Sequence, residues 1–399
     1  MKKLFFTALL SLLVVGVYAQ KKTLKSAQKA LNKKDYATAQ TLATQASENA
    51  ETAENPQVYV ILGTANVYMF KEDKTDVSKA QAAYDHFQKA VELGGDKVKE
   101  KLMEQVIMNN EGERLGGGEG FLFLQNMLNV QGNIYFESED YENAYNYFLI
   151  SSNIVPDDVV MAFYVGYSAY QSEKDEETIK YYEKVIELND AAPEESKFAN
   201  ANFAYNGLID VYLARRDDFD NALKYIGLAK EAFPEEKLYK DYEIEVLIKA
   251  EKMDEAIDAL KKEVEEGVAD ESTLYTLAYL QWNNQEIEEA LIAADKALEM
   301  NPNYYDALYV AGTVHFNLAV ETLKAANNTD PSDTAGYDKL LAEAKEKFKT
   351  AMPYFEKALE QKPEDTYSLN PLSTIYDQLD MDAKRDAIFE RLKAINGEN

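Results

Sequence analysis

Hydrophobic residues recur every three to four positions along most of the chain, in segments separated by short polar breaks. The pattern is clearest in residues 128–190, where two similar halves align on Gly132 and Gly166, 34 residues apart (166 − 132 = 34). Each half is typical of an amphipathic helix, a tight turn and a second helix. One such pair has too little apolar surface to be stable alone, so neighbouring pairs must stack on it. The pattern therefore predicts an all-α solenoid, and no alternation of period two indicates a strand.

Small and aromatic residues recur at fixed places within these units. Gly132 and Ala144 lie where two paired helices are expected to cross closely, and Phe148 follows Ala144 by four residues. The matching residues of the first half are Leu128, Gly132, Tyr135, Ala144, Phe148 and Pro156. This set resembles the tetratricopeptide repeat (TPR) family, and further matches follow through nearly all of residues 20–399. The resemblance implies a right-handed superhelical TPR solenoid of about eight or nine helix-turn-helix units, several of them degenerate.

The first half of the chain contains two departures from the 34-residue period. Gly63 and Ala83 are 20 residues apart, against 12 in the family pattern, which predicts eight extra residues in the connection near 71–78. Farther on we expect a helix over 97–109 and a flexible Gly-rich break near 111–120, within a degenerate unit. That break lacks the GK[ST] motif and the preceding strand of a phosphate-binding loop, so we interpret it as a plain loop.

Two insertions interrupt the second half. One extra residue falls at Arg215–Asp218. His315 and Ala351 are 36 residues apart where the family has nine, so 27 residues are inserted (36 − 9 = 27). Apolar periodicity continues through most of the insertion, and polar residues with a proline at 327–334 favour a turn. We therefore predict an extended, projecting helical hairpin near 319–350, kinked at Pro353.

The N-terminus has the three parts of a secretory signal peptide. Basic residues at positions 2 and 3 precede an apolar run over 4–17, and Ala19 is a small residue at the expected cleavage point. We expect residues 1–19 to be removed, leaving 20–399 as a single TPR solenoid. The alternative is a membrane anchor, for which the run is short. The chain has no cysteine, which excludes a lipid-attached cysteine and disulfides. It resembles exported TPR proteins of Bacteroidetes, which implies a periplasmic, outer-membrane-associated or secreted protein.

The net charge of the chain limits the kinds of partner that it is expected to bind. The chain carries a formal net charge of −29, which disfavours nucleic acid and anionic membranes as partners and is compatible with basic ones. An acidic, solvated surface explains the same charge without any partner. Hydrophobic residues make up 46% of the sequence, so the chain is not a disordered acidic segment.

Candidate chemistry is sparse. His86 and His315 are the two histidines, and neither has a second histidine or a cysteine at metal-ligand spacing. No GxSxG motif or calcium-binding loop is present. Paired carboxylates such as Glu194–Glu195 could in principle hydrolyse glycosides, but on an acidic solenoid they are better interpreted as solvated charge. We therefore expect no catalytic residue, no metal site and no cofactor, and a protein that is not an enzyme.

In the TPR family the first helix of each pair lines a concave groove that binds peptides or proteins. Transferring those groove positions to this sequence gives Asn129, Asn133, Phe163, Tyr167, Tyr170, Asn206, Asp210, Tyr275, Tyr279, Trp282, Tyr309 and Asn317. Aromatic and amide side chains suit a peptide, since they combine flat apolar area with hydrogen bonding to a backbone. The same rings could instead recognise a glycan or another small ligand, or pack between repeats. No basic residue occupies the fifth position of any unit, so the chain does not resemble chaperone-binding TPR domains.

Overall fold

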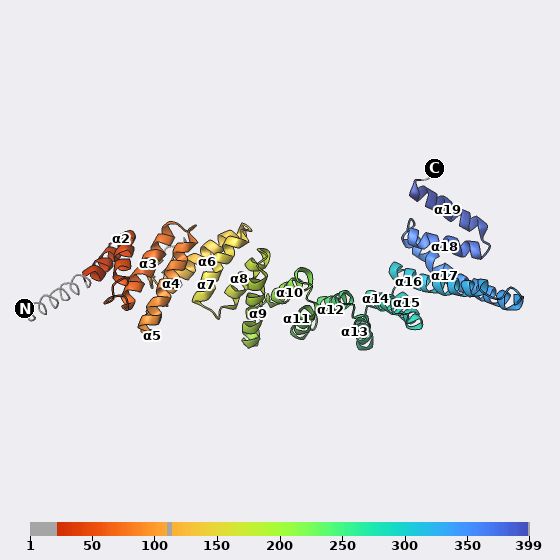
Figure 1. Ribbon diagram of the computed structural model, residues 1–399, viewed down its shortest axis with the longest axis horizontal. Coiled ribbons are helices and arrows are strands. Elements are labelled where there is room, and N and C mark those ends of the chain that lie inside the picture. Colours follow the sequence, from red (N-terminus) through yellow and green to blue (C-terminus); the bar gives the residue numbers. More distant parts are fainter. Residues whose placement is uncertain (1–21, 110–113, 398–399) are drawn as a thin grey trace, which may run out of the picture. The chain divides into compact units, whose positions relative to one another are not determined.

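The computed structural model describes residues 22–109 and 114–397, so the predicted signal peptide lies outside the described residues. Most described residues are helical, and within each unit most helices pack on the next helix along the chain. The chain divides into two compact units, one ending at Pro234 and one beginning at Glu235. Figure 1 shows both units, which are described separately below.

The first unit begins with helical residues 22–32 and continues through paired helices. Its helices are α2 (Tyr36–Ser47), α3 (Pro56–Glu72), α4 (Val77–Gly94), α5 (Asp96–Leu102), α6 (Phe121–Glu137), α7 (Tyr141–Ile154), α8 (Val159–Gln171), α9 (Asp175–Ala191), α10 (Ala201–Asp210) and α11 (Phe219–Ala232). A 3₁₀ turn (Glu194–Ser196) precedes α10 and a π-helical turn (Val211–Arg215) follows it. Two short antiparallel strands, β1 (Val106–Met108) and β2 (Arg114–Gly117), lie between α5 and α6.

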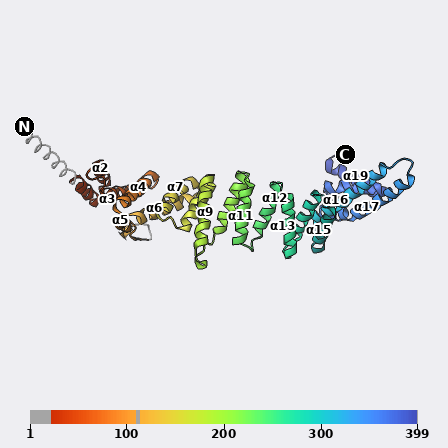
Figure 2. The ribbon, with the colours of Figure 1, turned by 60° about the horizontal axis from the view of Figure 1, so that its bottom comes forward.

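The second unit is all helical within its described residues, up to 397. Its helices are α12 (Lys237–Lys249), α13 (Met253–Glu266), α14 (Glu271–Asn283), α15 (Ile287–Met300), α16 (Tyr305–Asn327), α17 (Thr334–Gln361), α18 (Thr366–Gln378) and α19 (Asp382–Asn396). Most of the 27 inserted residues lengthen α16 and α17, which pack on each other and project beyond α15 and α18 (Figures 1 and 2). Pro353 lies inside α17. Among the described residues, none of the helices combines the length and apolarity needed to cross a bilayer.

Glycine–aromatic contacts explain the spacing seen in the sequence. A Cβ added at Gly132 would lie 2.7 Å from the Phe148 ring, and one at Gly166 would lie 2.7 Å from Tyr182. Both rings are buried between the helices of their pair. A side chain at either glycine would therefore separate the helices or displace a packed ring.

The helix boundaries are set by short polar residues. Aspartate or asparagine side chains accept backbone N–H bonds at the N-termini of many helices, as Asp158 does from Val160 and Met161. The residue ending each tight intra-pair turn has a left-handed backbone although it is not glycine: Lys34, Glu139, Glu173, Asp217, Glu251, Gln285 and Asp380. The N-cap residue of the next helix follows each of them directly, so one backbone geometry joins the two helices of a pair in both units.

The prediction for the Gly-rich region was wrong. The helix expected over 97–109 ends at Leu102, and Arg114–Gly117 of the expected loop form a β-hairpin strand paired with Val106–Met108, whereas 110–113 lie outside the described residues. Gly117 has φ +82°, and a Cβ there would lie 2.1 Å from the carbonyl oxygen of Gln105. The glycines therefore allow the returning strand to approach the backbone of the outgoing one, which a flexible loop would not require.

The two smaller insertions, of eight residues and of one residue, also lie mainly within helices. The connection between α3 and α4 is only residues 73–76, so the eight extra residues mainly lengthen these two helices instead of forming a loop near 71–78. The single extra residue expected at Arg215–Asp218 coincides with the π-helical turn that ends at Arg215. A π turn accommodates one additional residue within a helix, which keeps the flanking helices in phase.

Candidate functional site

In the first unit, five aromatic rings form a connected surface over α6, α8 and α10. We call the following residues the α6–α10 aromatic surface: Phe136, Phe163, Tyr167, Phe198 and Phe203. The ring centroids of Phe136 and Tyr167 are 5.4 Å apart, and those of Phe163 and Tyr167 are 5.9 Å apart. Phe198 and Phe203 lie 5.2 and 6.3 Å from Phe163. The rings thus connect three successive helix pairs, α6–α7, α8–α9 and α10–α11.

The exposure of these rings differs. Phe203 is 49% exposed, Phe136 and Tyr167 are half-buried, and Phe163 is buried. Phe163, predicted from the sequence as a contact residue, therefore mainly packs beneath the other rings. Phe203 was not predicted, although it occupies the second position of its unit, one of the groove positions of the family. Applying that position to every unit would have identified it.

Three predicted asparagines accompany this surface. Asn133 is exposed on α6. Asn129 accepts a hydrogen bond from the hydroxyl of Ser151, so it links α6 to α7. Asn206 has a buried Oδ1 with no partner among the described residues. The amide of Asn133 is the one best placed to bond a ligand, because its side chain is accessible.

Tyr170 and Asp210, also predicted as groove residues, bond each other. The Tyr170 hydroxyl donates to Asp210 Oδ2 at 2.8 Å, and the guanidinium of Arg215 lies 4.3 Å from the Tyr170 ring centroid. Arg215 also pairs with Asp175 at 3.0 Å. Burial and the bond to Asp210 raise the pKa of Tyr170. These groups join α8, α9, α10 and the π turn, so their first role is to hold the helices together.

In the second unit, three aromatic residues follow one another along α14. We call Tyr275, Tyr279 and Trp282 the α14 aromatic row. Neighbouring ring centroids are 6.3 and 6.2 Å apart, and Tyr279 is 41% exposed. Burial, followed by the carboxylate of Asp306, raises the pKa of Tyr275. Tyr279 is therefore the most accessible ring of the row, and Tyr275 and Trp282 are half-buried.

The two remaining predicted residues lie on α16. Tyr309 stacks on Tyr305 with ring centroids 6.4 Å apart and contacts the buried Phe355 at 6.4 Å. Asn317 is exposed. Tyr309 thus belongs partly to the core of the α16–α17 pair, whereas Asn317 is accessible.

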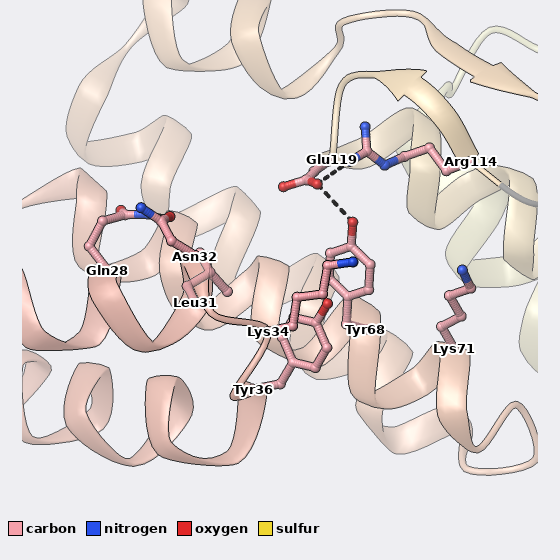
Figure 3. Close-up of a pocket in the computed structure, with 9 residues that line it drawn as sticks. All are labelled: Gln28, Leu31, Asn32, Lys34, Tyr36, Tyr68, Lys71, Arg114 and Glu119. Carbon is pink, nitrogen blue, oxygen red and sulfur yellow. Dashed lines mark hydrogen bonds and ion pairs between the residues drawn. The ribbon is translucent and has the colours of Figure 1, made fainter.

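A polar pocket of about 430 Å³, not expected from the sequence, lies in the first unit (Figure 3). Tyr36 and Tyr68 stack in it with centroids 4.6 Å apart. The Tyr68 hydroxyl donates to Glu119 Oε1 at 2.7 Å, and Arg114 forms an ion pair with the same carboxylate. Burial and the bond to Glu119 raise the pKa of Tyr68 to about 12. Arg114 and Glu119 belong to the segment that the sequence assigned to a loop, and no local signal placed them near Tyr68.

The histidines are packing residues. His315 stacks on Tyr354 with centroids 5.5 Å apart, and His86 lies within 3.5 Å of the Asn66 amide. Burial lowers the pKa of both. Within 22–109 and 114–397, no cluster of three or more histidine, aspartate or glutamate side chains is arranged to hold a metal ion.

Comparison with known proteins identifies one repeat. Residues 271–304, which include α14, α15 and Tyr304, match the model of the tetratricopeptide repeat family. No curated protein sequence matches the chain. The matched repeat and the helix pairs packed in the same way on either side of it make the fold that of an all-α TPR solenoid.

Several solved TPR structures are similar. The C-terminal part of a TPR protein from Cytophaga hutchinsonii aligns with 67% of this chain and 95% of its own, at 15% identity and a TM-score of 0.47. A TPR protein from Bacteroides fragilis aligns with 63% of this chain and 98% of its own, at 20% identity and a TM-score of 0.33. YrrB, described as a TPR protein with an unusual peptide-binding site, aligns with 56% of this chain and 96% of its own, at 20% identity and a TM-score of 0.37.

Proposed function

We propose that this protein is an exported, non-enzymatic scaffold that binds a peptide or protein segment through the aromatic surfaces of its TPR helices. The observation that carries the proposal is the half-exposed state of Phe136, Tyr167 and Phe203 beside the accessible amide of Asn133. Flat apolar rings next to a hydrogen-bonding amide match the apolar side chains and the polar backbone of a peptide. The α14 aromatic row offers a second surface of the same kind.

The accessible rings are not needed for the contact between the two helices of a pair. The contact between paired helices is already made by Gly132 with Phe148 and by Gly166 with Tyr182. Tyr167 and Tyr279 lie outside those contacts and keep part of their rings accessible. An aromatic anchor that becomes desolvated at an interface typically contributes at least about 2 kcal/mol to binding.

The test starts from peptides selected from a displayed random library against purified 20–399. We expect Tyr167→Ala or Trp282→Ala to weaken the selected peptide about thirtyfold. Tyr367→Ala is the matched control, because Tyr367 is 72% exposed on α18, outside both surfaces, and should leave affinity unchanged.

Helicity and melting temperature are measured for each variant. Unchanged affinity in both variants, with the fold intact, would contradict the proposal. A large loss of melting temperature would instead show that these rings are packing residues.

A further inference from the structure

The polar pocket of the first unit concentrates positive charge in an acidic chain. We call it the lysine pocket, and its lining residues are Gln28, Leu31, Asn32, Lys34, Tyr36, Tyr68, Lys71, Arg114 and Glu119. Lys34 lies in the turn before α2, Lys71 in the last turn of α3 and Arg114 on β2. Figure 3 shows Arg114 and Glu119 on one side and the lysines with the stacked tyrosines on the other.

The lysines have no internal partner. Neither Lys34 nor Lys71 makes a side-chain hydrogen bond or ion pair with a residue in the described ranges. Both side chains are exposed, unlike Arg114, which is held by Glu119 and by the carbonyl oxygen of Gly117 at 2.8 Å. Two ammonium groups are therefore available at the pocket.

The local charge has the opposite sign to the charge of the chain. The lining residues carry three positive charges and one negative charge, a sum of +2, against −29 for the whole sequence. Glu72, whose charge acts on Tyr36, reduces the local sum to +1. Lys33 and Asp35, the sequence neighbours of Lys34, carry opposite charges and leave this sum unchanged.

Glu119 already engages two of the donors at the pocket. Its carboxylate accepts from Tyr68 and pairs with Arg114, so Lys34 and Lys71 are the cations left for a ligand, and ammonium groups pair with carboxylates. Gln28 Nε2 donates to Asn32 Oδ1 at 2.9 Å and Gln28 Oε1 accepts from Gln57, so the Nδ2 group of Asn32 is the amide donor left for a peptide backbone. The volume of about 430 Å³ exceeds the size of a single small ion.

We propose that the lysine pocket binds a carboxylate-bearing ligand, namely an acidic peptide segment, and that Lys34 and Lys71 are its anchoring cations. This site is separate from the aromatic surfaces and does not depend on them. The net charge of the chain disfavours binding of an acidic partner. The locally positive pocket would allow such a partner to bind at this one site.

The experiment uses fluorescein-labelled tetraglutamate and the chain 20–399 in a fluorescence anisotropy titration at physiological ionic strength, where charges outside the pocket are screened. Lys34→Gln and Lys71→Gln should each weaken binding about fivefold, the size of one partly exposed charge contact. Glutamine fits the left-handed backbone at position 34, since Gln285 adopts φ 65° at the equivalent turn position. Helicity should therefore be unchanged.

Lys33→Gln is the matched control. It removes the same charge one residue away, and Lys33 does not line the pocket. Its affinity should stay within twofold of the parent chain. Equal losses of affinity in Lys33→Gln and Lys34→Gln would show that only the general charge of the surface matters and would overturn the proposal.

A competition experiment tests the identity of the ligand. If inorganic phosphate at the same concentration displaces the probe with the same dependence on Lys34, the pocket binds phosphate, and the proposal of a peptide ligand is overturned.

Discussion

The glycines that face aromatic rings differ in how closely the ring approaches. A Cβ at Gly63 would lie 2.3 Å from Phe87, whereas one at Gly312 would lie 3.2 Å from Phe355. Both rings are fully buried, so neither can move away without disturbing its neighbours. The same substitution at the two positions therefore separates the steric cost of a methyl group from its effect on helix propensity.

We expect Gly63→Ala to lower the free energy of unfolding by about 1–2 kcal/mol, because overpacking exceeds the gain of about 1 kcal/mol in helix propensity. Gly312→Ala should change it by less than about 1 kcal/mol, since a shift of a few tenths of an ångström relieves the contact. Urea denaturation of both variants measures the difference. Equal effects would show that ring distance does not set the cost.

Individual site residues could be predicted only in part. Family spacing predicts Tyr167 and Tyr279 as groove residues, and both side chains are partly accessible. It could not show that Phe198 and Phe203 pack against Phe163, because Phe198 belongs to a connection outside the repeat pattern. Repeat spacing predicts the helix face on which a side chain lies. Its burial also depends on which side chains of the following segment pack over that face.

At the scale of the element, α14 depends on its N-cap. Asp270 Oδ1 accepts from the Thr273 backbone N–H at 2.8 Å, and Asp270 Oδ2 accepts from Lys237 Nζ at 2.8 Å. Burial opposes ionisation, but the bonds from Lys237 and Thr273 prevail and lower the pKa of Asp270 to about 2. The carboxylate thus caps the helix of the TPR match and ties it to α12.

Asp270→Ala should destabilise the protein by about 1–2 kcal/mol near neutral pH, since both the cap and the ion pair are lost. Asp270→Asn keeps the cap and should cost about 1 kcal/mol or less, because the ion pair is partly exposed. Because the folded pKa lies below the unfolded value, the contribution is present above the unfolded pKa and is lost as pH falls from about 5 towards 2.

The measurement is urea unfolding of the parent chain and both variants at neutral pH and at about pH 3. The parent chain should lose more stability than Asp270→Asn over this range. An equal loss in the two chains would show that Asp270 titrates with an ordinary pKa.

Elements were predictable where the repeat pattern held and not where it failed. The long α16–α17 pair follows from apolar spacing that continues through the insertion at 319–350. The β1–β2 hairpin does not follow from such spacing, because its strands have three and four residues and its glycines resemble those of a loop. In that hairpin the register depends on close backbone approach, which composition does not reveal.

At the scale of the whole molecule, many acidic side chains stabilise helix ends in addition to keeping the surface solvated. Aspartates cap helices in both units, including Asp35, Asp140, Asp218, Asp333 and Asp365. A carboxylate at a helix N-terminus also interacts favourably with the helix dipole. Part of the net charge of −29 is therefore tied to helix boundaries, and it does not by itself indicate a basic partner.

The last prediction concerns export, which is proposed from the sequence of residues 1–19. The apolar run over 4–17 has 14 residues, which as a helix would span about 21 Å, well below the ~30 Å of a bilayer core. A cleaved signal peptide explains this length, the basic start and the small residue at 19 together. We expect the intact mass of the protein from its native cell to correspond to a chain beginning at Gln20. A mass that retains Met1 on membrane-bound protein would replace export with anchoring, and then the binding surfaces would act at a membrane.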